Sequence, residues 1–507
     1  MLRIAIITFL VSYCAGFFSQ TIYSRDFEAR KKNVPISIIN NNSNYFFLLR
    51  YNKVAHDITL ERRAKPSAEI ISFTPLKLDS VNADWFNYEK LDNLFFEHNY
   101  HVYFLFEKVL NTKQTLYLKI IDTLGKSSGF IELATIEKEK GVTSVNFEYK
   151  RTLNNSILIV ATQTYGNFAA KKIALLFDLE TRKITWEKKL PIENDNTGYS
   201  IAYECNKNND LFCVFVKAHI ASYKRKYMNH AQMMVPVLFF DSLSIVSFLN
   251  NNSSSVKKKL VATNLSSLNS ILLFPVNNDL VINAHITKED ASGEVNIYFL
   301  NQKLSADLSK EFYSVAAPLD DSIKIALTFY DGTDYNSAGE KEYRHFINFQ
   351  ENNFNYRLSE RVEDYYSKEL LVWKNDLETG MVSGQKIIPR KIYSFQGRTR
   401  FKNITKAMPY VYDNKLHVIV LEATQNLKKD PNQFNFHRFK KEASLAKSNL
   451  VLYTLNTNGI LEKKLIYHNA NFDAVPMNYQ SDKQEELILY LDGGKREKFA
   501  ILKLSQL

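Results

Sequence analysis

Two stretches of this 507-residue chain bring cationic side chains and aromatic rings close together. The first holds Tyr223, Lys224, Arg225, Lys226 and Tyr227, and the second holds Lys428, Lys429, Phe436, Arg438, Phe439 and Lys440. Alternating cations and rings can bind an anionic glycan, with sugar faces on the rings and acid groups on the bases, or single-stranded nucleic acid. In the alternative interpretation, the phenylalanines pack a short helix from Asp430 onward and the lysines are only solvated.

The net charge of +11 favours an acidic partner in a general way. We expect a protein or an anionic glycan rather than nucleic acid.

Two histidines end strand-like runs in the same Ala-His-Ile sequence, His219 and His285. Such a pair can share a metal ion or act in acid-base chemistry, although histidines that cap buried strands are commoner. The sequence contains no GxSxG, HExxH, phosphate-cradling glycine loop or sialidase-type Asp-box. We therefore predict no cofactor, and we favour a binding protein over an enzyme.

The elements that position these residues follow a repeat. The tetrapeptide Asp-Leu-Glu-Thr begins at Asp178 and again at Asp376, each time between two extended apolar runs. Four further hairpins share this pattern, around Asp122, Asp241, Asn301 and Asn456. A second hairpin precedes each of them, so the repeating unit has four strands, A to D.

Strands B and C are nearly continuous apolar runs, such as Ile157–Ala161 and Ala174–Phe177. A strand has this composition when both faces of its sheet are covered, as in the radially packed blades of a propeller. Four prolines, tolerated where a strand has a free edge, lie in or beside predicted A strands: Pro275, Pro318, Pro409 and Pro476. We predict an all-β chain forming a β-propeller of about seven four-stranded blades, with six or eight blades or tandem β-sandwiches as alternatives.

The predicted domains are a signal peptide over residues 1–19, strands over residues 20–84 that close the ring, and the propeller over residues 85–507. The leader has a basic start at Arg3, an apolar run and small residues before residue 20; a lipoprotein anchor on Cys14 is the alternative. No later run is long enough to span a bilayer. We expect an exported protein that is periplasmic, at the cell surface or secreted.

Cys205 and Cys213 flank an Asn-rich turn. A hairpin centred near Asn209 would set them face to face, and an oxidising compartment would allow a disulfide; two buried thiols are the alternative.

Three insertions follow predicted B strands, at Ser222–Met234, Asp331–Glu369 and Gln425–Asn449. B–C connections all leave a propeller on one face, and long loops on a rigid scaffold commonly bind ligands. The first and third insertions are the basic, aromatic stretches, whereas the second is acidic.

The chain resembles a group of uncharacterised exported proteins from Bacteroidota, flavobacteria in particular. The resemblance lies in "FFSQ", "LVWKNDLETGMVSGQKIIP", "LVLYTLNTNGILEKKLIY" and "ELILYLDGGKREKFAILKL". It implies export and a repeat fold, but no activity. We expect a binding or scaffold propeller; the alternatives are a glycan-active enzyme with acids at the channel mouth and a structural subunit of an envelope assembly.

Overall fold

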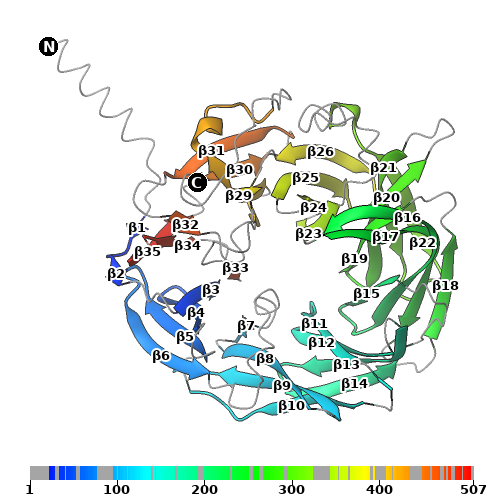
Figure 1. Ribbon diagram of the computed structural model, residues 1–507, viewed down its shortest axis with the longest axis horizontal. Coiled ribbons are helices and arrows are strands. Elements are labelled where there is room, and N and C mark those ends of the chain that lie inside the picture. The colour runs from blue at the N-terminus through cyan, green and yellow to red at the C-terminus, as the bar shows by residue number, and fades with distance from the viewer. Residues whose placement is uncertain are drawn as a thin grey trace.

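The computed structural model confirms an all-β chain folded as a β-propeller, with eight blades around a central axis (Figure 1). It describes residues 22–503 with gaps, the longest being residues 77–94, 191–198, 324–342, 394–406 and 433–447. The sequence favoured about seven blades, and eight was one alternative.

Blades I to IV follow one another along the chain, and each lists its strands from the axis outward. Blade I has β3 (Asn33–Ile39), β4 (Tyr45–Asn52), β5 (Asp57–Ala64) and β6 (Ile70–Leu76); blade II has β7 (Phe95–His98), β8 (His101–Val109), β9 (Lys113–Ile121) and β10 (Ile131–Glu137); blade III has β11 (Ser144–Arg151), β12 (Ser156–Tyr165), β13 (Phe168–Asp178) and β14 (Lys183–Lys189); blade IV has β15 (Tyr199–Cys205), β16 (Leu211–Met228), β17 (Ala231–Phe248) and β18 (Ser255–Val261).

Blades V to VIII complete the ring. Blade V has β19 (Ser267–Val276), β20 (Asp279–Glu289), β21 (Val295–Leu304) and β22 (Glu311–Pro318); blade VI has β23 (Tyr343–Glu351), β24 (Phe354–Glu363), β25 (Tyr366–Asp376) and β26 (Val382–Ile388), with β27 (Ile392–Tyr393) beside β25; blade VII has β28 (Met408–Tyr412), β29 (Lys415–Ala423), β30 (Ser448–Leu455) and β31 (Leu461–Tyr467); blade VIII has β32 (Asp473–Val475), β34 (Glu486–Asp492) and β35 (Arg496–Lys503).

The blade absent from the sequence count is blade I. Its strands begin at Asn33, before the first hairpin that the repeat pattern identified. Residues interpreted as closing strands therefore form a complete antiparallel sheet of their own.

The ring is closed at two edges. On the outside, β1 (Ile22–Tyr23) and β2 (Phe27–Glu28) pair with β35 and supply the fourth strand of blade VIII. On the inside, β33 (Asn478–Gln480) leaves blade VIII and pairs in parallel with β3 of blade I. Both additions cover strand edges that would otherwise be free to pair with another chain.

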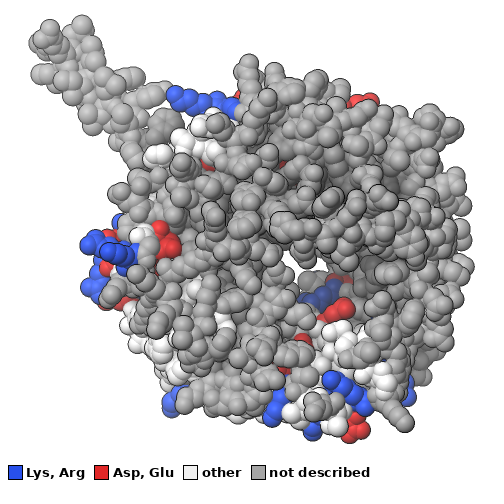
Figure 2. Space-filling model, in the orientation of Figure 1, with Lys and Arg blue, Asp and Glu red and all other residues white. Residues whose placement is uncertain are grey.

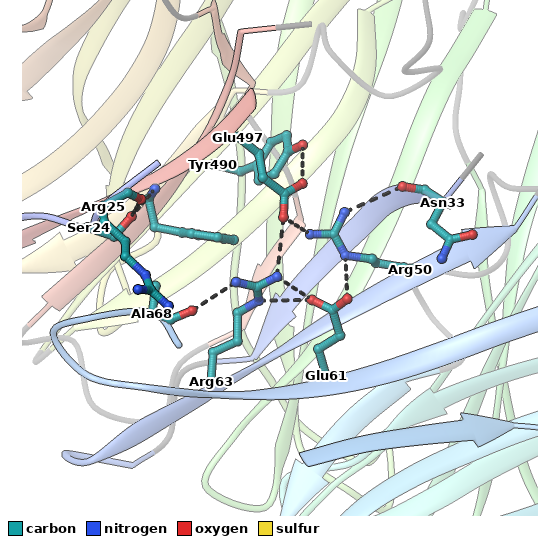
Figure 3. Close-up of polar contacts among 10 residues, drawn as sticks. Ser24, Arg25, Asn33, Arg50, Glu61, Arg63, Ala68, Tyr490 and Glu497 are labelled. Atoms are coloured by element: carbon teal, nitrogen blue, oxygen red, sulfur yellow. Dashed lines mark hydrogen bonds and ion pairs between the residues drawn. The ribbon is translucent and has the colours of Figure 1, made fainter. Parts of the chain in front are cut away.

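A buried ionic cluster joins the two blades at this closure (Figure 3). Arg50 on β4 contacts Glu61 at 2.9 Å and Glu497 at 2.5 Å, and Arg63 contacts the same two carboxylates at 2.6 and 3.2 Å. The Tyr490 hydroxyl donates to Glu497 at 3.0 Å. Two arginines and two glutamates balance in charge, which buried ions require.

The amino-terminal strands pack directly on this cluster. The guanidinium of Arg63 lies 5.1 Å from the ring of Phe27 on β2 and 4.7 Å from that of Phe499 on β35. Between β1 and β2, the Ser24 amide donates to the Phe499 carbonyl at 2.9 Å, and the Ser24 hydroxyl accepts from the Phe499 amide at 3.0 Å. The first described residues are thus part of the last blade.

The core explains why B strands are continuous apolar runs. In β12, Ile157 and Ile159 belong to a cluster with blades I and II, whereas Leu158 and Val160 belong to a cluster with blade IV. Alternate side chains therefore pack on opposite neighbours. Of the prolines, Pro275 and Pro409 lie in the innermost strands β19 and β28, Pro318 ends the outermost strand β22, and Pro476 lies outside the described residues.

The A–B turns form a polar belt at one face of the ring. Five of them contain a residue with positive φ: Asn99, Asn155, Asn209, Asn277 and Asp413. Asn and Asp tolerate this left-handed conformation better than other side chains do. Neighbouring turns also bond to one another, for example through Asn206 Nδ2 and the Asn278 carbonyl at 2.8 Å.

The repeated tetrapeptide forms two C–D turns, and its side chains stabilise them. Asp178 and Asp376 each accept the amide of the threonine three residues later, at 2.6 and 2.8 Å. The buried leucine after each aspartate donates its amide to the A–B turn of the same blade, at Asn155 (3.3 Å) and Asn353 (2.8 Å). The tetrapeptide thus ties the two turns of a blade together.

Candidate binding face

Two B–C ends of the ring depart from the repeat. Between β29 and β30 the connection covers residues 424–447, while the other B–C connections span at most five residues. In blade IV, β16 and β17 have 18 residues each, and the other B and C strands have seven to eleven.

The long strands of blade IV continue as a two-stranded ribbon. β16 and β17 remain paired as far as Met228 and Ala231, but β15 pairs with β16 only up to Val216, and β18 pairs with β17 only from Ser242. We call residues 217–228 and 231–240 the ribbon.

The first basic, aromatic stretch lies in this ribbon. The predicted insertion Ser222–Met234 is therefore an extended hairpin rather than an irregular loop. Its basic and aromatic members pair with uncharged residues of β17: Tyr223 with Pro236, Lys224 with Val235, Arg225 with Met234, Lys226 with Met233 and Tyr227 with Gln232.

The first residues of the β29–β30 connection, 424–429, are held in place by hydrogen bonds, and we call them the root of this connection. It opens with a short 3-10 turn, Thr424–Asn426, and Asn449 Nδ2 donates to the Thr424 hydroxyl at 2.9 Å. Lys463 on β31 donates to the Asn426 carbonyl at 2.7 Å and contacts Glu422 at 3.2 Å. The buried Glu422 also accepts from the Tyr453 hydroxyl at 2.7 Å.

These contacts fix the direction in which the connection leaves the blade. Burial raises the pKa of Glu422 above the ordinary glutamate value, although Lys463 and Tyr453 oppose the change.

Of the second basic, aromatic stretch, the structure describes only the start. Lys428 is exposed, whereas Lys429 is partly buried and donates to Asn426 Oδ1 at 3.0 Å, so it braces the root. Phe436, Arg438, Phe439 and Lys440 lie outside the described residues, as does the helix expected there apart from its first residues, 430–432, which are not helical.

The structure corrects the prediction of an acidic insertion at Asp331–Glu369. Most of its described part is β23 and β24, the first two strands of blade VI, and the B–C connection of this blade is only residues 364–365. Just before it, where the repeat pattern predicts a hairpin, residues 321–323 are helical, and residues 324–342 lie outside the described residues. Polar residues in the strands themselves led to the misplaced boundary.

The two candidate histidines lie in B strands of adjacent blades, His219 in β16 and His285 in β20. His285 is fully buried, with its Nε2 atom 3.2 Å from the Ser359 hydroxyl and its ring 5.9 Å from that of Trp373. The side chain of His219 lies outside the described part. Among the residues described, no group of three His, Cys, Asp or Glu side chains is arranged to hold a metal ion.

Both cysteines are buried free thiols. The hairpin register sets Cys205 opposite Leu211 and Cys213 opposite Tyr203, so the two do not face each other. Burial raises the pKa of both thiols, which makes them poor nucleophiles.

A space-filling view shows a hollow at the centre of the ring with charged atoms of both signs in it (Figure 2). On the innermost strands, Lys150 of β11 contacts Glu204 of β15 at 2.6 Å and so joins blades III and IV. Burial raises the pKa of Glu204, against the effect of Lys150.

One polar cluster was not anticipated. Between blades V and VI, buried asparagine side chains bond in series: Asn283 to Asn301 (3.0 Å), Asn355 to Asn283 (3.3 Å) and Asn355 to Asn375 (3.1 Å). These residues interrupt otherwise apolar B and C strands, and that interruption was the available signal. Each of these side chains bonds to at least one other, although Asn355 Oδ1 and Asn375 Nδ2 have no hydrogen-bond partner among the described residues, and the bond between Asn283 and Asn355 joins the two blades.

Beside the asparagines lies Arg357, which is fully buried. Its guanidinium is 4.9 Å from the ring of Phe299, which stacks on Trp373 at 4.6 Å. Burial lowers the pKa of Arg357 to about 9.

No helix in the described part of the chain is long and apolar enough to cross a membrane.

No known family profile and no curated protein matches this chain. Among solved structures, it is similar to the Nup133 β-propeller domain of Vanderwaltozyma polyspora, at 11% identity over 80% of this chain and 99% of that one, with a TM-score of 0.33. It is similar to the WD40 domain of SCAP from fission yeast, at 6% identity over 97% and 96% of the two chains, with a TM-score of 0.35. It is also similar to the polysaccharide lyase Uly1, at 8% identity over 70% and 99%, with a TM-score of 0.33. These similarities are distant, and the propeller fold of this chain is established by its own strand order.

Proposed function

We propose that this is an exported binding or scaffold propeller that holds a protein or anionic glycan on the face with the B–C connections. The observation that carries the proposal is the one-sided elaboration of the ring. The 424–447 connection and the ribbon both extend B–C ends, while the A–B turns of blades I to VII span two to five residues and some neighbouring turns bond to one another. A rigid ring that carries long segments on one face is typical of binding scaffolds.

Export is part of the proposal, and it is supported by the signal-like leader and by the resemblance to exported proteins of Bacteroidota.

The anchored start of the 424–447 connection supports the binding role. Glu422, Asn426 and Lys463 hold the start of the connection against β30 and β31. A segment fixed in direction at its root loses less entropy on binding than one that is free at both ends.

The test is to replace residues 433–447 with a short Gly/Ser linker and to leave the root intact. We expect at least a tenfold loss of retention of partners crosslinked in the native envelope, or of acidic glycans on an array. The melting temperature should change by only a few degrees, since the root contacts remain. A matched control replaces Glu180–Arg182, three exposed residues of a C–D turn on the opposite face, and should retain binding. Unchanged binding by the linker variant would refute the proposal.

A further inference from the structure

The ribbon is the part of β16 and β17 that continues beyond the other two strands of blade IV. No other described strand pairs with residues 217–228 or 231–240. Eleven residues from Ala218 to Met228 span roughly 35 Å at the usual rise of a strand. A ribbon of two strands is only marginally stable in water, so it gains stability when a further surface packs on it.

The ribbon carries a net positive charge in its own sequence. From Lys217 to Asp241, the last residue before β17 pairs with β18, the chain has four Lys or Arg residues and one acidic residue, Asp241. Three of the four are consecutive, Lys224, Arg225 and Lys226, and tyrosines flank them on both sides. This charge favours an anionic surface.

The composition of β17, which pairs with the cationic part of β16, indicates which kind of anionic surface the ribbon binds. Met233, Met234 and Val235 pair with Lys226, Arg225 and Lys224. The eight residues from Met233 to Phe240 are all apolar. A soluble anionic glycan offers sugar faces but no hydrocarbon for an apolar strand, whereas a lipid interface offers anionic headgroups beside hydrocarbon. Tyrosine is also enriched at that boundary.

We infer that the ribbon docks the protein on an anionic lipid surface. Figure 1 shows β16 and β17 leaving blade IV and crossing the view toward β23 and β24. The inference rests on the proposed function in one respect, the use of the B–C face, and adds a lipid contact to it. The two fail separately, because the test of the proposed function changes residues 433–447 and leaves the ribbon intact.

The experiment measures partition of the full chain onto vesicles of phosphatidylglycerol and phosphatidylethanolamine, with phosphatidylcholine vesicles as the neutral reference. One variant carries K224Q, R225Q and K226Q. Its matched control carries K257Q, K258Q and K259Q, three consecutive lysines of β18 in the same blade. Since each base near an anionic surface contributes about 1 kcal/mol, the ribbon variant should partition about 100-fold more weakly at low salt, and the control within about threefold of wild type.

A second measurement separates the ribbon from the apolar leader, which every variant shares. In a Met233→Trp variant, brominated anionic lipids should quench fluorescence beyond the wild-type level. Equal partition of wild type and ribbon variant, or no added quenching, would overturn the inference. Retention on dextran sulfate without vesicle binding would also overturn it, in favour of an anionic glycan.

Discussion

At the scale of single residues, the strongest polar contacts hold blades together rather than face a ligand. Arg50, Glu61, Arg63 and Glu497 form a charge-balanced cluster with side chains that are at most 2% exposed. Such a cluster adds little net stability over an apolar core, but loss of one member leaves an uncompensated buried charge. Its value lies in specifying which two blades meet.

The variant Glu61→Gln tests this reading. It leaves two buried guanidinium groups with one carboxylate, so we expect a loss of about 3–5 kcal/mol in the free energy of unfolding. Denaturant midpoints measure the change. The control is Glu69→Gln, which removes the exposed ion pair with Arg25 and should cost less than about 1 kcal/mol. Equal effects of the two substitutions would refute a special role for the cluster.

At the scale of elements, the two closing strands manage exposed edges. β1 and β2 together contribute only four residues to the edge of β35, and between them Ser24 makes two hydrogen bonds to the Phe499 backbone, one through its amide and one through its hydroxyl. Without them, β35 would present unpaired amides and carbonyls to solvent, as a free edge strand does.

The contribution of β1 and β2 can be tested by comparing a chain that begins at residue 20 with one that begins at residue 29. The shorter chain lacks β1 and β2, and several backbone hydrogen bonds at about 1 kcal/mol each should be lost, roughly 3 kcal/mol in total. We expect it to self-associate with rising concentration in size-exclusion chromatography with light scattering, and the longer chain to remain unchanged. A monomeric shorter chain of equal stability would show that β1 and β2 are dispensable.

At the scale of the whole molecule, buried carboxylates with opposite pKa changes should shape the pH dependence of stability. Burial raises the pKa of Glu204 and Glu422 more than the nearby lysines lower it. Burial also acts to raise the pKa of Glu61, but Arg50 and Arg63 outweigh it and hold that pKa below the ordinary value.

The signs therefore differ between the two kinds of site. A raised pKa means that the folded state binds the proton more tightly, so protonation of Glu204 and Glu422 stabilises the fold as pH falls from 7. A lowered pKa means that the contribution of Glu61 is complete above the unfolded value, near 4.3, and is lost as pH falls through its folded value.

We expect a stability maximum in mildly acidic solution and a steep loss below about pH 4. Denaturant midpoints between pH 3 and 8 measure the profile. Glu422→Gln should flatten the rise from pH 7 toward the maximum, and Glu61→Gln should flatten the acid limb. A profile that neither substitution alters would contradict this assignment.

The sequence by itself determined the fold class, because a strand buried on both faces needs an apolar run and an A–B turn with positive φ needs a residue that tolerates this conformation. Both requirements are local, so Ile157–Ala161 and Asn155 indicate them without a structure. Tertiary structure decided what depends on distant pairing: the eighth blade, the closure through β1, β2 and β33, and the meeting of Arg50 with Glu497 across 447 positions. It also decided that Ser222–Met234 is paired ribbon, because strand pairing depends on a partner's register and not on the composition of one segment.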